Sequence, residues 1–349
     1  MKVIITGDWH YSAYSSEGKV IQNYPEKLYY LDRTHRNICE YAIKNEIKYI
    51  IVLGDIYHTK SIIYTLAQDM LMNLVRNYRD KVHFIFLQGN HDLSSRSEIS
   101  SSTLEGFRSE PNVIVITETT TLPLKDLFGS HDSIFVPYTH NIVNEVKSNS
   151  GKNLFSHFGL NEGVLNSGIS VVSDIKLSEL KGKYENVFIG HYHSPQEIID
   201  NDIKLWYVGS SIQLDIGEKN EDKRFLVFNT INNTVESIPT QGYKKLYEYL
   251  ITEENKQQVI EEAKLHKEEG HNVRFVKKEK VDTDDLKKDF IVIDKTEKDI
   301  MNRGLSSAMN EREKLARYVE IQKIKEELKE PLINAGLEFI NRAKVRMAK

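Results

Sequence analysis

Short polar motifs that carry metal-binding residue types recur through the first half of the chain. The five motifs are GDWH (7–10), GDIYH (54–58), GNHD (89–92), SHF (156–158) and GHYH (190–193). Four of them closely follow runs of strand-forming residues, which are VII (3–5), YIIVL (49–53), FIFL (84–87) and VFI (187–189). Several buried strands that end at one edge of a sheet create a rigid, concave, polar site. The repeated pattern therefore predicts a layered α/β protein with an enzyme site at that edge.

Composition limits the classes of protein that the chain can form. At 349 residues it fits two or three domains, and an apolar share of 40% is enough for a sizeable core. No apolar run approaches the roughly 18 residues that cross a bilayer, and the first residues enter a strand directly, so we expect neither a membrane protein nor a signal peptide. Cys39 is the single cysteine, which excludes an intrachain disulfide and favours a reducing, cytoplasmic environment. A net charge of −4 means that any nucleic acid is held by a local patch, by metals or by a partner chain.

Residues 1–240 alternate short hydrophobic strands with amphipathic segments, which is typical of an α/β fold. Helices are predicted at 25–47 and 60–78. The apolar stripe of the second helix is broad enough to cover a sheet and still leave surface for another chain, although packing on the sheet alone also accounts for it. We expect antiparallel strands to close this domain, at 205–210, 224–228 and 234–238, with a hairpin turn at Asn232 and Asn233.

The remainder of the chain has a different, more charged composition. Residues 241–294 predict a small α+β module with a helix at 253–269 and strands at 272–277 and 290–293. A polar linker follows, and residues 295–349 end in two predicted helices. The first covers 305–329, and Pro331 starts the second at its first turn. Two short amphipathic helices cannot bury both apolar faces alone, so we expect them to dock on a partner, the alternative being that they fold back onto the small module.

The five motifs together offer a set of ligands for two metal ions. Any single motif is weak evidence, because aspartate and histidine are common beside turns. The joint set is far more specific, and its members are Asp8, His10, Asp55, Asn90, His157, His191 and His193. This is too many for one tetrahedral zinc but suits two ions that share a carboxylate, a centre suited to phosphoryl transfer with a nearby histidine as acid. Oxygen and imidazole ligands without thiolate favour Mn²⁺, Fe²⁺ or Zn²⁺.

This ordered set of motifs resembles the calcineurin-like metallophosphoesterase superfamily, over residues 1–240. The resemblance implies a four-layer β-sandwich flanked by helices, with the small α+β module as a capping domain and the helical pair at the C-terminus. It also implies a role for each candidate side chain. One metal would take Asp8, His10 and His193, the other would take Asn90, His157 and His191, Asp55 would bridge them, and His91 would be the acid.

Within that superfamily the layout resembles the SbcD-type DNA double-strand-break repair nucleases, including the nuclease subunits of phage recombination complexes. The order of capping module, linker and helical pair carries this resemblance, together with VGSSIQ at 208–213 and His58. It implies an Mn²⁺-dependent DNA exonuclease and endonuclease, in which His58 helps to place the DNA backbone. The location would be the cytoplasm, or the host cytoplasm if the chain is viral.

The same resemblance implies protein partners. Two copies would form a homodimer through helices at 60–78 and about 97–107. Residues of about 305–349 would bind the coiled coil of an SMC-like ATPase, with a docking face that comprises Leu315, Tyr318, Val319 and Ile321.

Two other functions compete with this interpretation. A small-molecule phosphodiesterase or nucleotide pyrophosphatase could use the same scaffold, but it would leave the C-terminal helices without a role. A non-enzymatic scaffold that has lost its metals is disfavoured because every motif keeps its ligands.

Overall fold

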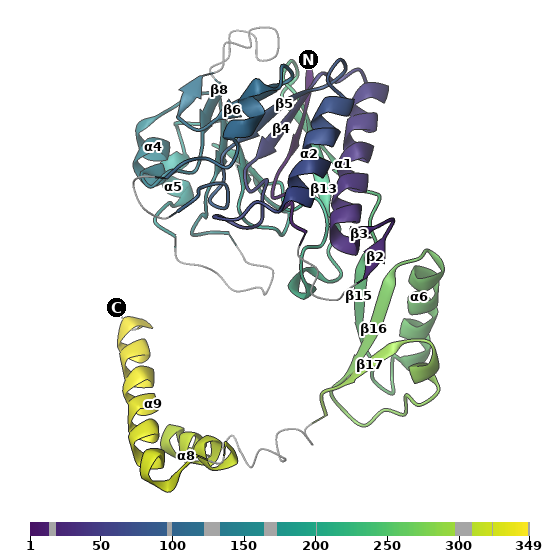
Figure 1. Cartoon of the computed structure of the whole chain (residues 1–349), viewed down its shortest axis with the longest axis vertical. Helices are drawn as coiled ribbons and strands as arrows, with labels where there is room; N and C mark the ends of the chain where they lie inside the picture. The colour runs from purple at the N-terminus through teal and green to yellow at the C-terminus, as the bar shows by residue number, and fades with distance from the viewer. Residues whose placement is uncertain are drawn as a thin grey trace. The chain divides into compact units, whose positions relative to one another are not determined.

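The computed structural model describes residues 1–13, 19–95, 100–121, 133–163, 173–199, 201–296, 309–322 and 324–347, and the side chains of these ranges up to residue 340. The chain divides into two compact units, Met1–Leu246 and Tyr247–Lys349 (Figure 1). Among the described residues, no helix combines the length and hydrophobicity that a membrane crossing requires.

Two six-stranded sheets form the centre of the first unit. The first has the order β14-β13-β1-β4-β5-β6, in which β1, β4, β5 and β6 are parallel and β13 and β14 are antiparallel additions. Its strands are β1 (Lys2–Thr6), β4 (Tyr49–Leu53), β5 (His83–Leu87), β6 (Val113–Ile116), β13 (Arg224–Asn229) and β14 (Thr234–Pro239). The second has the order β11-β12-β10-β9-β8-β7, with β8, β9, β10 and β12 parallel. Its strands are β7 (Thr120–Thr121), β8 (Ser133–Val136), β9 (Asn153–His157), β10 (Asn186–Gly190), β11 (Gln196–Ile199) and β12 (Lys204–Tyr207).

The two sheets pack face to face. Alternate residues of β1, such as Val3 and Ile5, join side chains of the second sheet in one buried cluster. Within it the rings of Phe135, Phe155, Phe188 and Trp206 stack in sequence across neighbouring strands, with centroid separations of 4.7, 5.2 and 5.0 Å. Because the parallel strands are buried on both faces, they read as continuous apolar runs rather than as an alternation.

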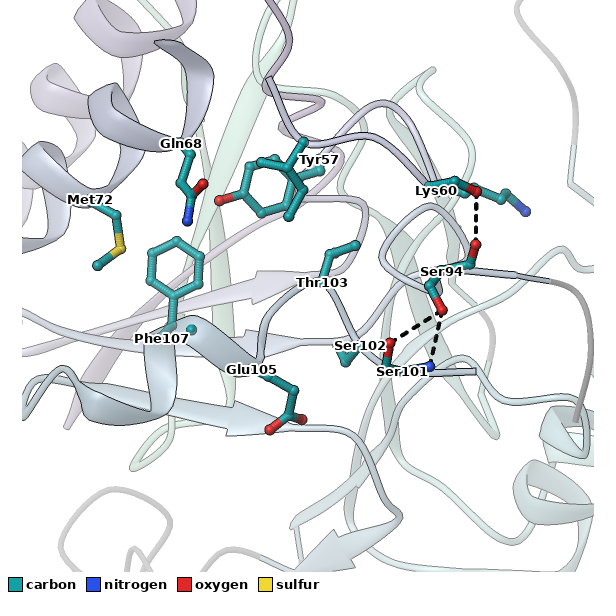
Figure 2. A pocket seen from close by; sticks show the side chains of 13 residues that line it. Tyr57, Lys60, Gln68, Met72, Ser94, Ser101, Ser102, Thr103, Glu105 and Phe107 are labelled. Carbon is teal, nitrogen blue, oxygen red and sulfur yellow. Dashed lines mark hydrogen bonds between the residues drawn. The ribbon is translucent and has the colours of Figure 1, made fainter. Parts of the chain in front are cut away.

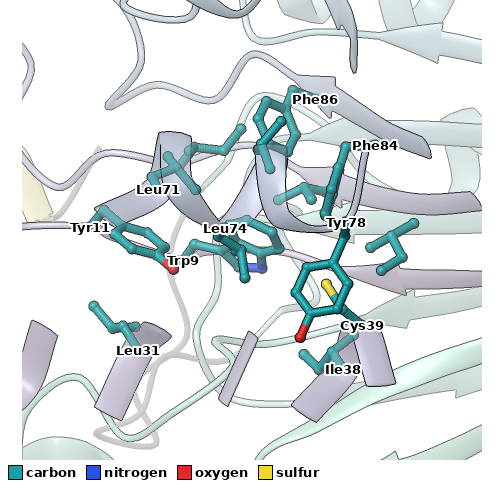
Figure 3. Packing of buried hydrophobic residues seen from close by; sticks show 14 of the residues in the cluster. Trp9, Tyr11, Leu31, Ile38, Cys39, Leu71, Leu74, Tyr78, Phe84 and Phe86 are labelled. Atoms are coloured by element: carbon teal, nitrogen blue, oxygen red, sulfur yellow. The ribbon is translucent and has the colours of Figure 1, made fainter. Parts of the chain in front are cut away.

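Helices cover the outer face of each sheet, which completes the four layers that the family resemblance implied. The helices α1 (Glu26–Lys44) and α2 (Thr65–Asn77) pack on the first sheet, where Leu31, Leu71 and Leu74 meet Trp9 and Phe84 (Figure 3). The shorter α4 (Ile142–Ser148) and α5 (Leu177–Leu180) cover the second sheet. A small ribbon of β2 (Val20–Ile21) and β3 (Tyr24–Pro25) precedes α1, and short 3-10 turns lie at Glu105–Ser109 and Ile216–Glu218.

Three local predictions for this unit need correction. The helix expected at 60–78 begins only at Thr65. The expected second dimer helix at 97–107 is a short 3-10 turn that begins at Glu105, and its residues 97–99 lie outside the described part of the chain. The three closing strands are not one antiparallel run, because β12 pairs in parallel with β10 in the second sheet. The hairpin prediction is confirmed, since β13 and β14 are antiparallel and Asn233 has a φ of 56°.

The second unit begins with a three-stranded sheet, β15-β16-β17. Its elements are β15 (Leu246–Leu250), α6 (Lys256–Glu268), β16 (Asn272–Lys277), a 3-10 turn at Leu286–Lys288 and β17 (Ile291–Asp294). Side chains of α6, such as Val259 and Ala263, pack with Phe275 and Phe290 in a small core. This agrees with the α+β module predicted from the sequence.

Two helices end the chain, α8 (Glu311–Ile321) and α9 (Glu326–Met347). The predicted boundaries are wrong, because a break after Ile321 divides the expected helix at 305–329, and Pro331 lies inside α9 rather than at its first turn. The break lets the helices pack on each other, and a Cβ atom placed on Gly336 would lie 3.0 Å from the Leu315 methyl carbons. Val319 is buried, so it does not belong to the predicted docking face. Most of the expected linker, 297–308, lies outside the described residues.

Candidate metal centre

All five motifs lie at the carboxyl ends of strands that point to one edge of the two sheets. The motif at 156–158, which lacked a predicted strand, overlaps the end of β9 and lies beside β10. Four of the candidate ligands have left-handed backbone conformations, with φ of 50° at Asp8, 50° at His10, 53° at Asp55 and 96° at His191. Such conformations cost energy in residues other than glycine and cluster at functional sites.

The first group of candidate ligands is Asp8, His10 and His193, whose ligand atoms all lie within 4.8 Å of one another. Nε2 of His10 lies 3.0 Å from Nε2 of His193. The Asp8 carboxylate also accepts hydrogen bonds from the backbone N–H of His191 at 3.0 and 3.1 Å, so it links the first motif to the fifth.

The second group is Asp55, His157 and His191, again within 4.8 Å. Oδ1 of Asn90 lies between the two imidazoles, 3.0 Å from Nε2 of His157 and 2.9 Å from Nδ1 of His191. His157 is oriented by its other nitrogen, which donates to the Leu53 carbonyl at 2.7 Å.

Asp55 lies between the two groups. Its Oδ1 is 3.4 Å from Nε2 of His157, and its Oδ2 is 3.7 Å from Nε2 of His10. The six other candidate ligands therefore form two clusters, one on each side of the buried Asp55 carboxylate. The converging carboxylate, amide and imidazole atoms are donors that fit a pair of hard or borderline divalent ions.

Burial dominates the protonation of this centre. Burial raises the pKa of Asp8 to about 6 and lowers the pKa of His191 to about 3, and it holds the pKa of His10 well below its usual value. For Asp55 burial acts to raise the pKa, but the nearby His157 outweighs it and lowers the pKa. Burial likewise opposes the shift at His157, where the Asp55 charge raises the pKa to about 9. A metal ion binds the deprotonated imidazole, so cation binding at the second group competes with protonation of His157.

His58 and His91 lie beside the first group. Nδ1 of His58 is 3.2 Å from Nδ1 of His10, and Nδ1 of His91 is 2.5 Å from the His58 carbonyl oxygen. The backbone N–H of His91 donates to Asp55 at 2.7 Å. Both candidate catalytic histidines are thus tied to the ligand clusters by hydrogen bonds.

Two buried acidic residues at the centre were not predicted from the sequence. The Asp92 carboxylate accepts from the backbone N–H groups of Ile56, Tyr57 and Gly89, at 3.0, 3.1 and 2.8 Å, and so ties the second motif to the third. Glu218 accepts a hydrogen bond from Nδ1 of His193 at 2.9 Å. Burial acts to raise the pKa of Glu218, but His193 and Lys223 outweigh it and lower the pKa to about 2. The motif that contains Asp92 was visible in the sequence, whereas nothing local marked Glu218 as a neighbour of His193.

The first unit is a double sheet flanked by helices, and it carries two clusters of metal-type ligands around the Asp55 carboxylate. This combination defines a class of metal-dependent phosphoester hydrolases. The sequence model for calcineurin-like phosphoesterases matches residues 1–222, and the chain belongs to that family. The superfamily predicted from the motifs is therefore confirmed.

Comparisons with individual proteins give more distant similarities. The chain is 25% identical over 246 residues to exonuclease subunit 1 of Enterobacteria phage T4, covering 68% of each sequence. It is 21% identical over 303 residues to a subunit of the nuclease SbcCD of Staphylococcus epidermidis, covering 79% of this chain and 78% of the relative. Among solved structures, an archaeal phosphodiesterase is 14% identical with a TM-score of 0.36, covering 68% of this chain and 99% of that one. A dimetal phosphatase from Danio rerio is 12% identical with a TM-score of 0.40, covering 69% and 99%.

Proposed function

We propose that this protein is a dinuclear metal-dependent DNA nuclease, exonuclease and endonuclease in type, and the nuclease subunit of a recombination and repair complex. The observation that carries the phosphodiesterase chemistry is the pair of ligand clusters on either side of Asp55. Support for a nucleic acid as the substrate comes from the relatives named as an exonuclease subunit and as a subunit of the nuclease SbcCD. The choice of DNA follows the resemblance of the motif layout to DNA repair nucleases.

In this proposal Asp8, His10 and His193 would hold one ion, Asn90, His157 and His191 would hold the other, and Asp55 would contribute to both. Nitrogen and oxygen donors without thiolate are compatible with Mn²⁺, which we propose as the working metal. When bound, two such ions supply Lewis-acid chemistry and a nucleophile at neutral pH for an in-line displacement at phosphorus.

The residues of the chain supply orientation and a proton. His91 donates from Nδ1 to the His58 carbonyl, which leaves Nε2 as the nitrogen that can carry a proton to the leaving oxygen. Its backbone N–H bond to Asp55 fixes the His91 loop to the shared ligand. The side chain of His58 is exposed and in contact with His10, so it can reach a phosphate of the DNA backbone beside the cleaved bond.

The test is DNA degradation by the purified protein in Mn²⁺. His91→Ala should lower the rate of cleavage by at least about 100-fold, while DNA binding and bound metal stay close to wild type. His83→Ala is the matched control, because His83 is an exposed histidine at the start of β5 and His91 follows the end of that strand. A His91→Ala rate within about threefold of wild type, less than roughly 1 kcal/mol of barrier, would show that the assigned role is wrong. Faster turnover of cyclic nucleotides or nucleotide-linked diesters than of DNA would favour a small-molecule phosphodiesterase instead.

We also propose that two copies associate through the surface around α2. Ile62 and Leu66 are 56% and 36% exposed there. Beside them lies a hollow of about 310 Å³, whose lining includes Tyr57, Met72 and Phe107 (Figure 2). Exposed apolar side chains next to a hollow with a mixed polar and apolar lining on the same surface suit a self-complementary, two-fold interface.

The helical pair is the proposed docking site for a coiled-coil ATPase subunit. Tyr318 and Ile321 on α8 are 57% and 42% exposed, and Leu332 and Phe339 on α9 are 45% and 75% exposed. Large apolar side chains are usually covered in a stable complex, so these four residues form the proposed contact face.

A further inference from the structure

Glu218 and Lys223 form a buried ion pair directly behind His193. The side chains of both residues are fully buried, and Oε2 of Glu218 lies 2.7 Å from Nζ of Lys223. Taking two charges out of water is costly, so such a pair persists only where hydrogen bonds complete it. The contacts around this pair show what it holds.

Every polar atom of the pair has a partner in the same loop or in the fifth motif. Oε2 of Glu218 also accepts from the Ser210 hydroxyl and from the backbone N–H of Leu214, each at 3.0 Å. Lys223 donates to the His193 carbonyl at 2.9 Å and to Glu221 at 2.6 Å. Lys223 therefore holds the backbone of His193 while it fixes the Glu218 carboxylate.

The other carboxylate oxygen, Oε1, faces the ring of His193, 2.9 Å from Nδ1. A neutral imidazole has one N–H, and a carboxylate can only accept, so this contact assigns the proton to Nδ1. The lone pair is then on Nε2, the nitrogen that lies 3.0 Å from Nε2 of His10 in the first ligand group. A carboxylate behind a metal-binding histidine fixes the tautomer and raises the basicity of the ligand nitrogen.

Two other imidazoles of the clusters, those of His157 and His10, are held differently. His157 donates to a backbone carbonyl, that of Leu53, and Nδ1 of His10 faces the ring of His58. Among the described residues, His193 is the candidate ligand whose outer nitrogen faces a carboxylate. The effect of Glu218 should therefore fall on the ion of the first group more than on the other ion.

We propose that Glu218, fixed by Lys223, is a positioning residue that presents Nε2 of His193 to the metal of the first ligand group. This inference rests on the proposed dinuclear site and extends it to a residue outside the five motifs.

The test is calorimetric titration of the metal-free full-length chain with Mn²⁺, together with thermal unfolding in chelator. The wild-type chain should bind two ions. Glu218→Ala should weaken one of them by about 10- to 100-fold and leave the other within about threefold. Glu218→Gln should have an affinity for that ion between those of the wild type and Glu218→Ala, because an amide oxygen can still accept from Nδ1 but lacks the charge.

Glu110→Ala is the matched control, because Glu110 is also buried and paired with cations, Arg76 and Arg79, but contacts none of the candidate ligands. It should lower the unfolding temperature in chelator and leave both Mn²⁺ dissociation constants unchanged. Wild-type affinity in both Glu218 variants would overturn the role of Glu218, and so would equal weakening in Glu110→Ala. If Glu218→Ala does not fold, an unchanged Mn²⁺ affinity in Glu218→Gln is enough to overturn the proposed role of Glu218. A wild-type chain that binds no Mn²⁺ would overturn the proposed dinuclear site itself.

Discussion

Single residues at the metal centre are held in unfavourable backbone conformations by bonds between the motifs. The backbone N–H of Asp8 donates to the Gly54 carbonyl at 3.0 Å. That of His10 donates to the backbone carbonyl of Asp55 at 2.8 Å. A side chain at Gly89 would meet the Asp55 backbone nitrogen at 2.2 Å, so glycine is required for the second and third motifs to approach each other. The strain in one motif is thus balanced by contacts with the next, as expected where surrounding structure over-determines a site.

Asp92 is the residue for which this bracing makes the sharpest prediction. Replacing it by asparagine keeps the shape but turns an NH₂ group towards backbone N–H donors that the carboxylate now accepts. We expect the free energy of unfolding to fall by about 1–3 kcal/mol, the cost of an unsatisfied buried group. Chemical denaturation of the metal-free protein measures this loss. Because Asp92 ties the Asp55 loop to the Asn90 loop, bound metal should fall as well, and wild-type stability with wild-type metal content would contradict the bracing role.

The strands that hold the ligands could be predicted because their sequences are unbroken apolar runs, and β4 was predicted with its observed bounds. The strand β9 was missed because Asn153, Ser156 and His157 interrupt its pattern. These polar residues are buried, and their hydrogen bonds come from elsewhere in the fold, for example from Ser156 to the Val136 carbonyl at 2.6 Å. The local sequence shows that these side chains are polar. It does not show the distant hydrogen-bond partners that allow polar side chains to be buried in a sheet.

The candidate site shows the same division between local and distant information. The seven proposed ligands were visible because each carries its chemistry in a short motif at a strand end. Glu218 was not predicted as a neighbour of His193, because the contact joins residues 25 positions apart, with the strands β11 and β12 between them. In the C-terminal helices, Pro331 suggested a helix start, whereas the packing of Leu315 on Gly336 sets the actual arrangement.

The surface around α2 makes a prediction about assembly. Ile62→Glu places a charge in the proposed interface between two copies, where burial without a partner is costly. We expect a molar mass in light scattering that falls from that of a dimer to that of a monomer. The same substitution at Ile231, which is 84% exposed in the β13–β14 turn, should leave the mass unchanged. A wild-type monomer, or a dimer that persists in Ile62→Glu, would contradict this interface.

In the molecule as a whole, neither sheet contains the site alone. The first sheet ends in Asp8, His10, Asp55 and Asn90, and the second ends in His157, His191 and His193. Ions bound between them would therefore link the two sheets, and metal binding would stabilise the folded first unit.

Metal removal should consequently lower the stability of the folded chain. At a free ion concentration of 100 times the dissociation constant, one bound ion contributes about 2.7 kcal/mol. For a unit of this size that is a rise of about 5–10 °C in Tm per ion. Scanning calorimetry with Mn²⁺ and with chelator measures the difference, and Asp55→Ala should abolish most of it because that carboxylate lies between the two ligand clusters. An equal shift in Asp55→Ala would show that Mn²⁺ stabilises the chain elsewhere.

The division into two compact units makes a prediction about which part performs which task. All candidate ligands lie in Met1–Leu246, and the proposed ATPase contact lies in Tyr247–Lys349. Removal of residues 302–349 should therefore leave hydrolysis of a generic phosphodiester such as bis-p-nitrophenyl phosphate within about twofold of the full chain. The same deletion should abolish co-purification with a coiled-coil ATPase subunit. A double substitution on the exposed face, Tyr318→Glu with Phe339→Glu, should reproduce the loss of association without removing either helix. Loss of phosphodiester hydrolysis in the deletion would instead make the helical pair part of the catalytic unit, because a separate docking element has no reason to affect ligands that the two sheets hold in place.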